Sequence, residues 1–219
     1  MTWLSTDIEN ALCSYPKLKF DKKNFKVLGS IEIINPNTNE ALENYQLEII
    51  FPKGYPNNQL PIVKEVTEKI PRTDSRHVYS DGRFCLTTAL QEFLICRKGI
   101  NFTRFLSEIV YPFLATQLAI SCGWLDKFPQ GEYSHGYEGI YETYSDFLNL
   151  NDLELICKGI EMSFQKNHRN SLCFCGSTKK LKKCHLRHIS ILKNISTSQL
   201  KNDLQAIVQK KKLKLTPAK

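Results

Sequence analysis

Four residues in the last quarter of the chain have the types and spacing of a metal site. Cys173 and Cys175 form one close pair, and after eight intervening residues Cys184 and His185 form a second. Thiolate sulfur and imidazole nitrogen are preferred zinc ligands, and two close pairs can surround one tetrahedral ion. The spacing predicts a structural zinc site, with His188 as a less favoured fourth ligand. The alternative is a thiol cluster without metal.

The run from Cys173 to His185 resembles the SEC-C motif at the C-terminus of the secretion ATPase SecA. That motif has Cys-x-Cys, eight residues and Cys-His, with Gly-Ser and paired lysines between, and this chain has the same order. Because few apolar residues lie here, we expect the metal to supply much of the folding free energy. Residues 164–190 are therefore predicted to form a small zinc-binding motif.

A second candidate for chemistry is Cys85, which stands apart from the cluster. It closely follows the turn signal Asp81-Gly82, at the end of a segment with little regular pattern, 68–89. A long unpatterned segment inside a compact domain is functional or disordered. Thiolate is a strong nucleophile and a good leaving group, so Cys85 is a candidate nucleophile for acyl transfer. The alternative is a buried core thiol, which is what we expect of Cys13, Cys96, Cys122 and Cys157.

The elements around Cys85 are predicted to be a helix, a set of short strands and a second, longer helix. The first helix covers Thr2–Cys13 and ends before Pro16. The strands cover Phe25–Ile34, Tyr45–Phe51 and Pro61–Val66, with a turn at Asn35–Glu40. The longer helix covers Phe102–Leu118, and Pro112 should kink it or start a new one. Short strands joined by turns predict an antiparallel meander in an α+β fold.

This order resembles the ubiquitin-conjugating-enzyme family, in which a helix, a meander, an irregular active-site flap and a second helix follow one another. Tyr55-Pro56 matches the usual turn of the family, and the run DGRFCL, which contains Cys85, matches its Gly-x-x-Cys-Leu active-site pattern. The resemblance covers roughly residues 1–120. It implies a ubiquitin-conjugating-enzyme-like catalytic domain over residues 1–163.

The resemblance implies a role for Cys85 and a departure at His77. Such enzymes carry a protein C-terminus as a cysteine thioester and transfer it to a target amine. The family has a His-Pro-Asn tripeptide whose Asn lies eight residues before the cysteine, and here the tripeptide is Ser75-Arg76-His77. His77 could donate a hydrogen bond in place of the Asn, or act as a base toward the attacking amine.

A third group of candidates lies in the Gly/Tyr-rich connector of residues 131–144. Ser134, His135 and Tyr137 could line the thioester cleft if the connector folds back over it. The alternative is an ordinary aromatic loop that packs on the core. The acidic and apolar residues from Ser145 to Met162 predict one or two helices after it.

Charge divides the chain into two parts. Residues 164–219 hold fourteen Lys or Arg residues and one acid, a net charge of +13, whereas the whole chain is +8. Residues 191–219 are predicted to be a basic tail with a helix over Ser198–Lys210 and a disordered end. An acidic or nucleic-acid partner would suit this charge. The alternative is a solvated charged surface, since no aromatic residues for base stacking are interleaved in the tail.

The loss of the standard tripeptide implies a divergent, bacterial type of conjugating enzyme. It resembles the stand-alone enzymes of short type II CBASS antiphage operons, where the conjugated protein is a cGAS-like nucleotidyltransferase. No Gly-rich phosphate loop is present, so activation of the donor falls to a separate enzyme or to an activated donor. Two alternatives stay open: an inactive binding module of the same fold, and a nucleic-acid-associated protein acting through the zinc motif and basic tail.

The location expected from the sequence is the cytoplasm, without a membrane partner. No stretch of about 18 uncharged apolar residues is present to span a bilayer. The first fifteen residues carry acids where a secretory signal needs a basic start and an apolar stretch.

Overall fold

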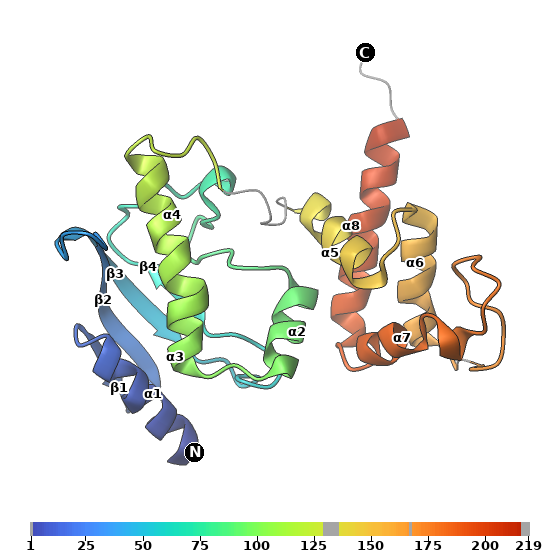
Figure 1. Cartoon of the computed structure of the whole chain (residues 1–219), viewed down its shortest axis with the longest axis horizontal. Helices are drawn as coiled ribbons and strands as arrows, with labels where there is room; N and C mark the ends of the chain where they lie inside the picture. The colour runs from blue at the N-terminus through green and yellow to red at the C-terminus, as the bar shows by residue number, and fades with distance from the viewer. Residues whose placement is uncertain (1, 129–135, 167, 216–219) are drawn as a thin grey trace. The chain divides into compact units, whose positions relative to one another are not determined.

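The computed structural model describes residues 2–128, 136–166 and 168–215, and the chain divides into two compact units (Figure 1). The first unit consists of Met1–Thr87 and Glu92–Glu132, and the second of Thr88–Gln91 and Tyr133–Lys219. The division therefore falls well before the boundary at residue 163 that the sequence suggested. The reason is that helices preceding residue 163 pack with the last helix of the chain, as described below.

A four-stranded antiparallel sheet forms the centre of the first unit. Its strands follow one another in the order β1 (Leu18–Asp21), β2 (Lys26–Ile34), β3 (Ala41–Ile50) and β4 (Ile62–Glu65). The meander predicted from the sequence is confirmed, and the predicted turn joins β2 to β3 with Asn35 N–H donating to Glu40 O at 2.9 Å. Strand β1 was not predicted, because four residues are too few to show a period of two.

Helices of the first unit pack against this sheet. α1 (Thr2–Ser14) contacts β1, and α4 (Tyr111–Ser121) contacts β2. Between α3 (Phe102–Phe105) and α4, residues Leu106–Val110 form a π-turn, so the chain reaches Pro112 at the start of a new α-helical segment. The wider hydrogen-bond ring of a π-helical turn leaves one carbonyl without its usual donor, which suits a proline because proline has no N–H to offer.

The segment with little regular pattern, 68–89, contains the 3₁₀ turn Asp74–Arg76 and an isolated bridge between Val78 and Phe84, and it leads into a helix that was not predicted. This helix, α2, covers Ala89–Lys98. Its Glu92 carboxylate accepts a hydrogen bond from Leu60 N–H at 2.7 Å, and burial raises the pKa of Glu92. The helix was missed because its mixed polar and apolar residues give a weak helical period.

The second unit is helical. It contains α5 (Tyr137–Leu148), α6 (Leu153–Glu161), α7 (Leu186–Leu192) and α8 (Thr197–Leu215), with 3₁₀ turns at Met162–Phe164 and Leu181–Lys183. The helices predicted within Ser145–Met162 and Ser198–Lys210 are present. The expectation of a disordered end is wrong up to Leu215, because α8 continues through a run of Lys and Leu, which are good helix formers. Within the described residues, no helix is long and apolar enough to cross a membrane.

A buried polar contact joins α5 to α8. The Tyr144 hydroxyl donates to Asp203 at 2.8 Å, and Gln199 Nε2 donates to the same carboxylate at 2.7 Å. Tyr144 is fully buried and Asp203 is 3% exposed. Burial raises the pKa of Asp203 above its usual range, and these two hydrogen bonds oppose the shift.

This carboxylate makes the stability of the second unit depend on pH. Because the folded-state pKa of Asp203 is raised, its contribution is fully present below the unfolded pKa and is lost as pH rises through the folded value. In Asp203→Asn this loss is expected to vanish. The free energy of unfolding of the mutant should therefore rise relative to that of the wild type between pH 4 and pH 7, the range in which a carboxyl group with a raised pKa titrates. Urea denaturation of both proteins across that range measures the difference. A difference independent of pH would contradict the prediction.

Candidate active site and metal centre

Cys85 lies at the end of a short β-hairpin, residues 77–85, which we call the Cys85 hairpin. Tyr79 N–H donates to Arg83 O at 2.8 Å, and Cys85 N–H donates to His77 O at 2.8 Å. The turn is closed by Gly82 N–H donating to Tyr79 O at 2.9 Å. Two antiparallel segments therefore hold the backbone of Cys85 at a fixed place.

The hairpin is attached to the edge of the sheet at β4. Phe84 N–H donates to Val63 O at 2.9 Å, and Glu65 N–H donates to Gly82 O at 3.1 Å. Phe84 also packs its ring 4.5 Å from that of Phe113 in α4. The position of Cys85 is thus fixed by the core of the first unit, although the sequence around it shows little pattern.

Side chains alternate between the two faces of the Cys85 hairpin. Val78 and Phe84 form an isolated bridge pair and are buried, at 4% and 8% exposure. Successive residues of a strand point to opposite faces, so Tyr79, Arg83 and Cys85 share the other face. Cys85 is half-buried and Tyr79 is 49% exposed, which agrees with this placement.

Tyr79 lies on the same face of the Cys85 hairpin as Cys85. A hydrogen bond with the Cys85 side chain, followed by burial, raises the pKa of Tyr79 to about 12. The Arg83 guanidinium lies 5.4 Å from the centre of the Tyr79 ring. Tyr79 therefore stays protonated near neutral pH, and its O–H can donate to the sulfur. Tyr79 was missed from the sequence, although the alternation of residues on either side of Asp81-Gly82 could have indicated it.

His77 is joined to Cys85 through its main-chain carbonyl. Its backbone is left-handed, with φ 53°, where the 3₁₀ turn Asp74–Arg76 ends and the hairpin begins. Its ring packs against Phe128, with the ring centroids 4.4 Å apart. The structure thus places His77 beside Cys85 in the hairpin, and its role as a hydrogen-bond donor or base stays a prediction.

The predicted connector residues divide between described and undescribed parts of the chain. Ser134 and His135 lie outside the described residues. Tyr137 is the first residue of α5 and belongs to the second unit, half-buried. The lining of a thioester cleft by these residues stays a prediction.

The isolated cysteines differ from one another in exposure. The expectation of core thiols is wrong for Cys13 and Cys122, which are exposed. Cys13 lies in the last turn of α1, and Cys122 directly follows the last residue of α4. Cys96 is buried, and burial raises its pKa to about 12, so it is unreactive near neutral pH. Cys157 is half-buried.

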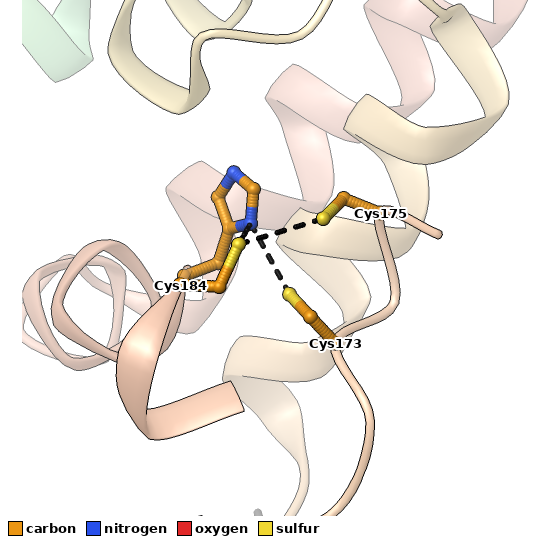
Figure 2. A group of neighbouring side chains, drawn as sticks. Cys173, Cys175 and Cys184 are labelled. Carbon is orange, nitrogen blue, oxygen red and sulfur yellow. Dashed lines mark hydrogen bonds between the residues drawn. The ribbon is translucent and has the colours of Figure 1, made fainter. Parts of the chain in front are cut away.

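The predicted metal ligands come together in the second unit. The donor atoms of Cys173, Cys175, Cys184 and His185 all lie within 4.8 Å of one another. Figure 2 shows the three cysteine side chains pointing toward a common centre. The sulfurs of Cys175 and Cys184 are 3.6 Å apart, close to the edge of about 3.8 Å expected for a tetrahedron with zinc–sulfur bonds of about 2.3 Å. The donor set and its spacing fit zinc.

His185 is oriented by a contact outside the donor group. Its Nδ1 lies 3.2 Å from Cys173 Sγ and 3.1 Å from Cys184 Sγ, while its Nε2 lies 2.8 Å from Leu148 O. A carbonyl can only accept, so Nε2 carries the proton and Nδ1 directs its lone pair into the group. His188 lies outside the group, its ring 5.5 Å from that of His185.

The thiols of the group have unequal pKa values. Burial raises the pKa of Cys173 to about 11. Burial also opposes ionisation of Cys175, but hydrogen bonds from Ser177 and the neighbouring cysteines outweigh it and lower the pKa of Cys175 to about 6. A crowded thiol group of this kind holds one thiolate readily, and a divalent cation would stabilise the others.

The metal centre is built against helices α5 and α6. The ring of Phe174 lies so close to Gly159 of α6 that a β-carbon there would stand 3.1 Å from it. Phe174 also packs 5.0 Å from the His185 ring, and His185 bonds to the last residue of α5, Leu148. The metal centre is therefore part of the second unit and not a free appendage.

Comparison with known families supports the metal centre. Residues 169–187 match the SEC-C motif, and this stretch holds all the donor residues. No curated protein and no solved structure matches the chain. The resemblance of the first unit to ubiquitin-conjugating enzymes stays a prediction from the sequence. The chain carries a SEC-C motif.

Proposed function

We propose that the chain is a cysteine-dependent acyltransferase in which Cys85 carries the C-terminus of a protein as a thioester and transfers it to an amine. The observation that supports it most is the placement of the half-buried Cys85 thiol on a hairpin fixed to the sheet, on the same face of that hairpin as Tyr79. A thiol held beside a proton donor, outside the core, suits a nucleophile better than a structural role.

The chemistry has two steps. The Cys85 thiolate attacks the carbonyl carbon of an activated acyl group, a sulfur–carbon bond forms, and the original leaving group departs. An amine then attacks the thioester carbonyl, the carbon–nitrogen bond forms, and Cys85 leaves as thiolate while the amine loses a proton to solvent or a nearby base. Tyr79 could donate to the sulfur, or to the oxyanion of each tetrahedral intermediate.

The arrangement of the first unit is compatible with the ubiquitin-conjugating-enzyme-like fold that the sequence resembles. A helix, an antiparallel meander, the Cys85 hairpin and a further helical segment follow in the expected order. We carry over from that resemblance the donor class, a protein C-terminus such as that of a cGAS-like nucleotidyltransferase in antiphage defence. Residues 164–219, with a net charge of +13, would suit an acidic target or partner.

We propose zinc as the metal of the SEC-C motif, with a structural role. Its four donors leave no open coordination position, and His185 links the group to the end of α5. Zinc bound there would hold the chain between α6 and α7 in one conformation.

Turnover of a defined thioester tests the acyltransferase. A short peptide with a C-terminal glycine thioester of mercaptoethanesulfonate and free lysine are incubated with the full chain, and the peptide–lysine amide is quantified by mass spectrometry. The wild type and Cys122→Ala, which loses an exposed thiol, should form the amide faster than buffer. Cys85→Ala should match buffer. Equal rates for wild type and Cys85→Ala would refute the proposal.

Removing the Tyr79 hydroxyl should slow this reaction. Tyr79→Phe keeps the ring beneath Arg83 but removes the hydroxyl that can donate to Cys85. A hydrogen bond to a charged group that is lost in the transition state lowers the rate about tenfold or more. Tyr141→Phe is the matched control, because its hydroxyl bonds to Asn151 O in the second unit. A Tyr79→Phe rate equal to that of the control would show that the hydroxyl has no part in transfer.

A further inference from the structure

A reciprocal set of hydrogen bonds joins the segment before Cys85 to α4. Gln117 Nε2 donates to Arg76 O at 2.5 Å, and Arg76 Nη2 donates to Gln117 O at 3.1 Å. The same guanidinium nitrogen also donates to the Ser121 hydroxyl. We call these contacts the Arg76–Gln117 clamp. They join residues 41 to 45 positions apart in the sequence and tie a 3₁₀ turn to the last two turns of α4.

The clamp acts on the residue that holds Cys85. Arg76 is followed directly by His77, whose left-handed backbone turns the chain into the Cys85 hairpin. The carbonyl of His77 then accepts the hydrogen bond from Cys85 N–H. A short path of fixed bonds therefore runs from α4, through Arg76 and His77, to the backbone of Cys85.

The clamp is poorly explained by stability alone. Gln117 is fully buried, and the Arg76 Nε and Gln117 Oε1 atoms are buried without a hydrogen-bond partner among the described residues. Buried polar atoms left unpaired cost free energy, and an apolar side chain of similar shape is often tolerated in their place. Stability alone therefore does not account for this buried polar pair, whose contacts set the position of Arg76 relative to α4.

We propose that the Arg76–Gln117 clamp is a positioning device that fixes His77 and thereby holds Cys85 in register for acyl transfer. The inference rests on the proposed function. The clamp fixes the loop that contains Ser75-Arg76-His77, the tripeptide at which this chain departs from the family it resembles. Arg76 and Gln117 act through His77 and do not touch the reacting sulfur.

Two readouts on Gln117→Met test the clamp. The side chain keeps its length but loses the donor to Arg76 O. Hydrogen–deuterium exchange should show the Cys85 amide exchanging about tenfold faster, the effect of losing one hydrogen bond. Thioester turnover should fall about tenfold or more, because small misplacements of a reacting group are costly. Gln46→Met, which changes an exposed glutamine of β3, is the matched control and should alter neither.

A second variant keeps the test decisive if Gln117→Met fails to fold. Arg76→Ala leaves a space that free guanidinium ion can occupy, so guanidinium at non-denaturing concentration should restore Cys85 amide protection and turnover. The same concentration of sodium chloride should not. Arg104→Ala, which removes an exposed arginine paired with Glu108, should show no rescue.

The outcomes separate this inference from the proposed function. Unchanged Cys85 amide exchange in both clamp variants would overturn the positioning role, whatever the turnover. If the wild type itself transfers no acyl group, the proposed function fails, yet the exchange measurement still decides whether the clamp holds Cys85. Faster exchange with unchanged turnover would show that the clamp orders the hairpin without serving transfer, and would also overturn the inference.

Discussion

Alanine at Cys173 is expected to remove the metal and unfold the second unit while the first unit stays folded. Cys173 is 6% exposed and its sulfur lies 3.2 Å from His185 Nδ1, so the substitution removes a buried donor atom from the group of four. Structural zinc contributes about 10–16 kcal/mol in small zinc sites, as much as the whole stability of many domains. We therefore expect the free energy lost with one ligand to exceed the stabilisation that the apolar contacts of the second unit can provide.

The measurement combines metal analysis with hydrogen–deuterium exchange on the full chain. Cys173→Ala should contain no zinc and lose protection in α5, α6 and α7, where His185 bonds to Leu148 and Phe174 packs on Gly159. Cys157→Ala, a half-buried thiol of α6 outside the donor group, is the matched control and should keep the metal. Full protection in metal-free Cys173→Ala would show that the helices fold without zinc.

Alanine at Gly82 is expected to displace the Cys85 hairpin and reduce acyl transfer about a hundredfold, the typical cost of a misplacement near 1 Å. Gly82 has φ 83°, and a β-carbon there would stand 2.7 Å from the main-chain oxygen of Glu65. Since a backbone oxygen in β4 cannot move aside cheaply, the hairpin must shift. Its hydrogen bond to Glu65 N–H should weaken at the same time.

Gly99→Ala is the control that separates backbone strain at positive φ from a steric clash of the added β-carbon. Gly99 has the same φ of 83° but no atom within 4 Å of an added β-carbon. It should lose about 1 kcal/mol of stability from the left-handed backbone alone and keep full turnover. Thioester turnover and thermal denaturation of both variants give the comparison. If Gly82→Ala transfers as fast as Gly99→Ala, the hairpin position is not needed for the reaction.

The metal centre could be predicted from the sequence because its signal is local. All of its donors lie within thirteen residues, Cys173 to His185, and their spacing predicts a metal site, with His188 left as a less favoured ligand. What the sequence does not give is the contact of His185 with Leu148, which lies 37 residues earlier. The attachment of the motif to α5 and α6 depends on that contact and on the fit of Phe174 against Gly159.

The meander and most helices could likewise be predicted from local periodicity, whereas the surroundings of Cys85 could not. The Cys85 hairpin is held by bonds to β4 and, through His77 and Arg76, to α4. Such contacts join residues far apart in sequence and leave no periodic pattern. Tyr79 was overlooked for a related reason, because its place diagonal to Cys85 depends on a hairpin that was not predicted.

The covalent intermediate is the most direct test of the proposal that Cys85 accepts an acyl group. The full chain is incubated briefly with the glycine peptide thioester and digested, and every cysteine is examined by mass spectrometry. The expected result is one peptide adduct on Cys85, removed by hydroxylamine, formed faster than any adduct on the more exposed Cys13 and Cys122. Adducts that appear on Cys13 and Cys122 first, with Cys85 unmodified, would contradict the proposal.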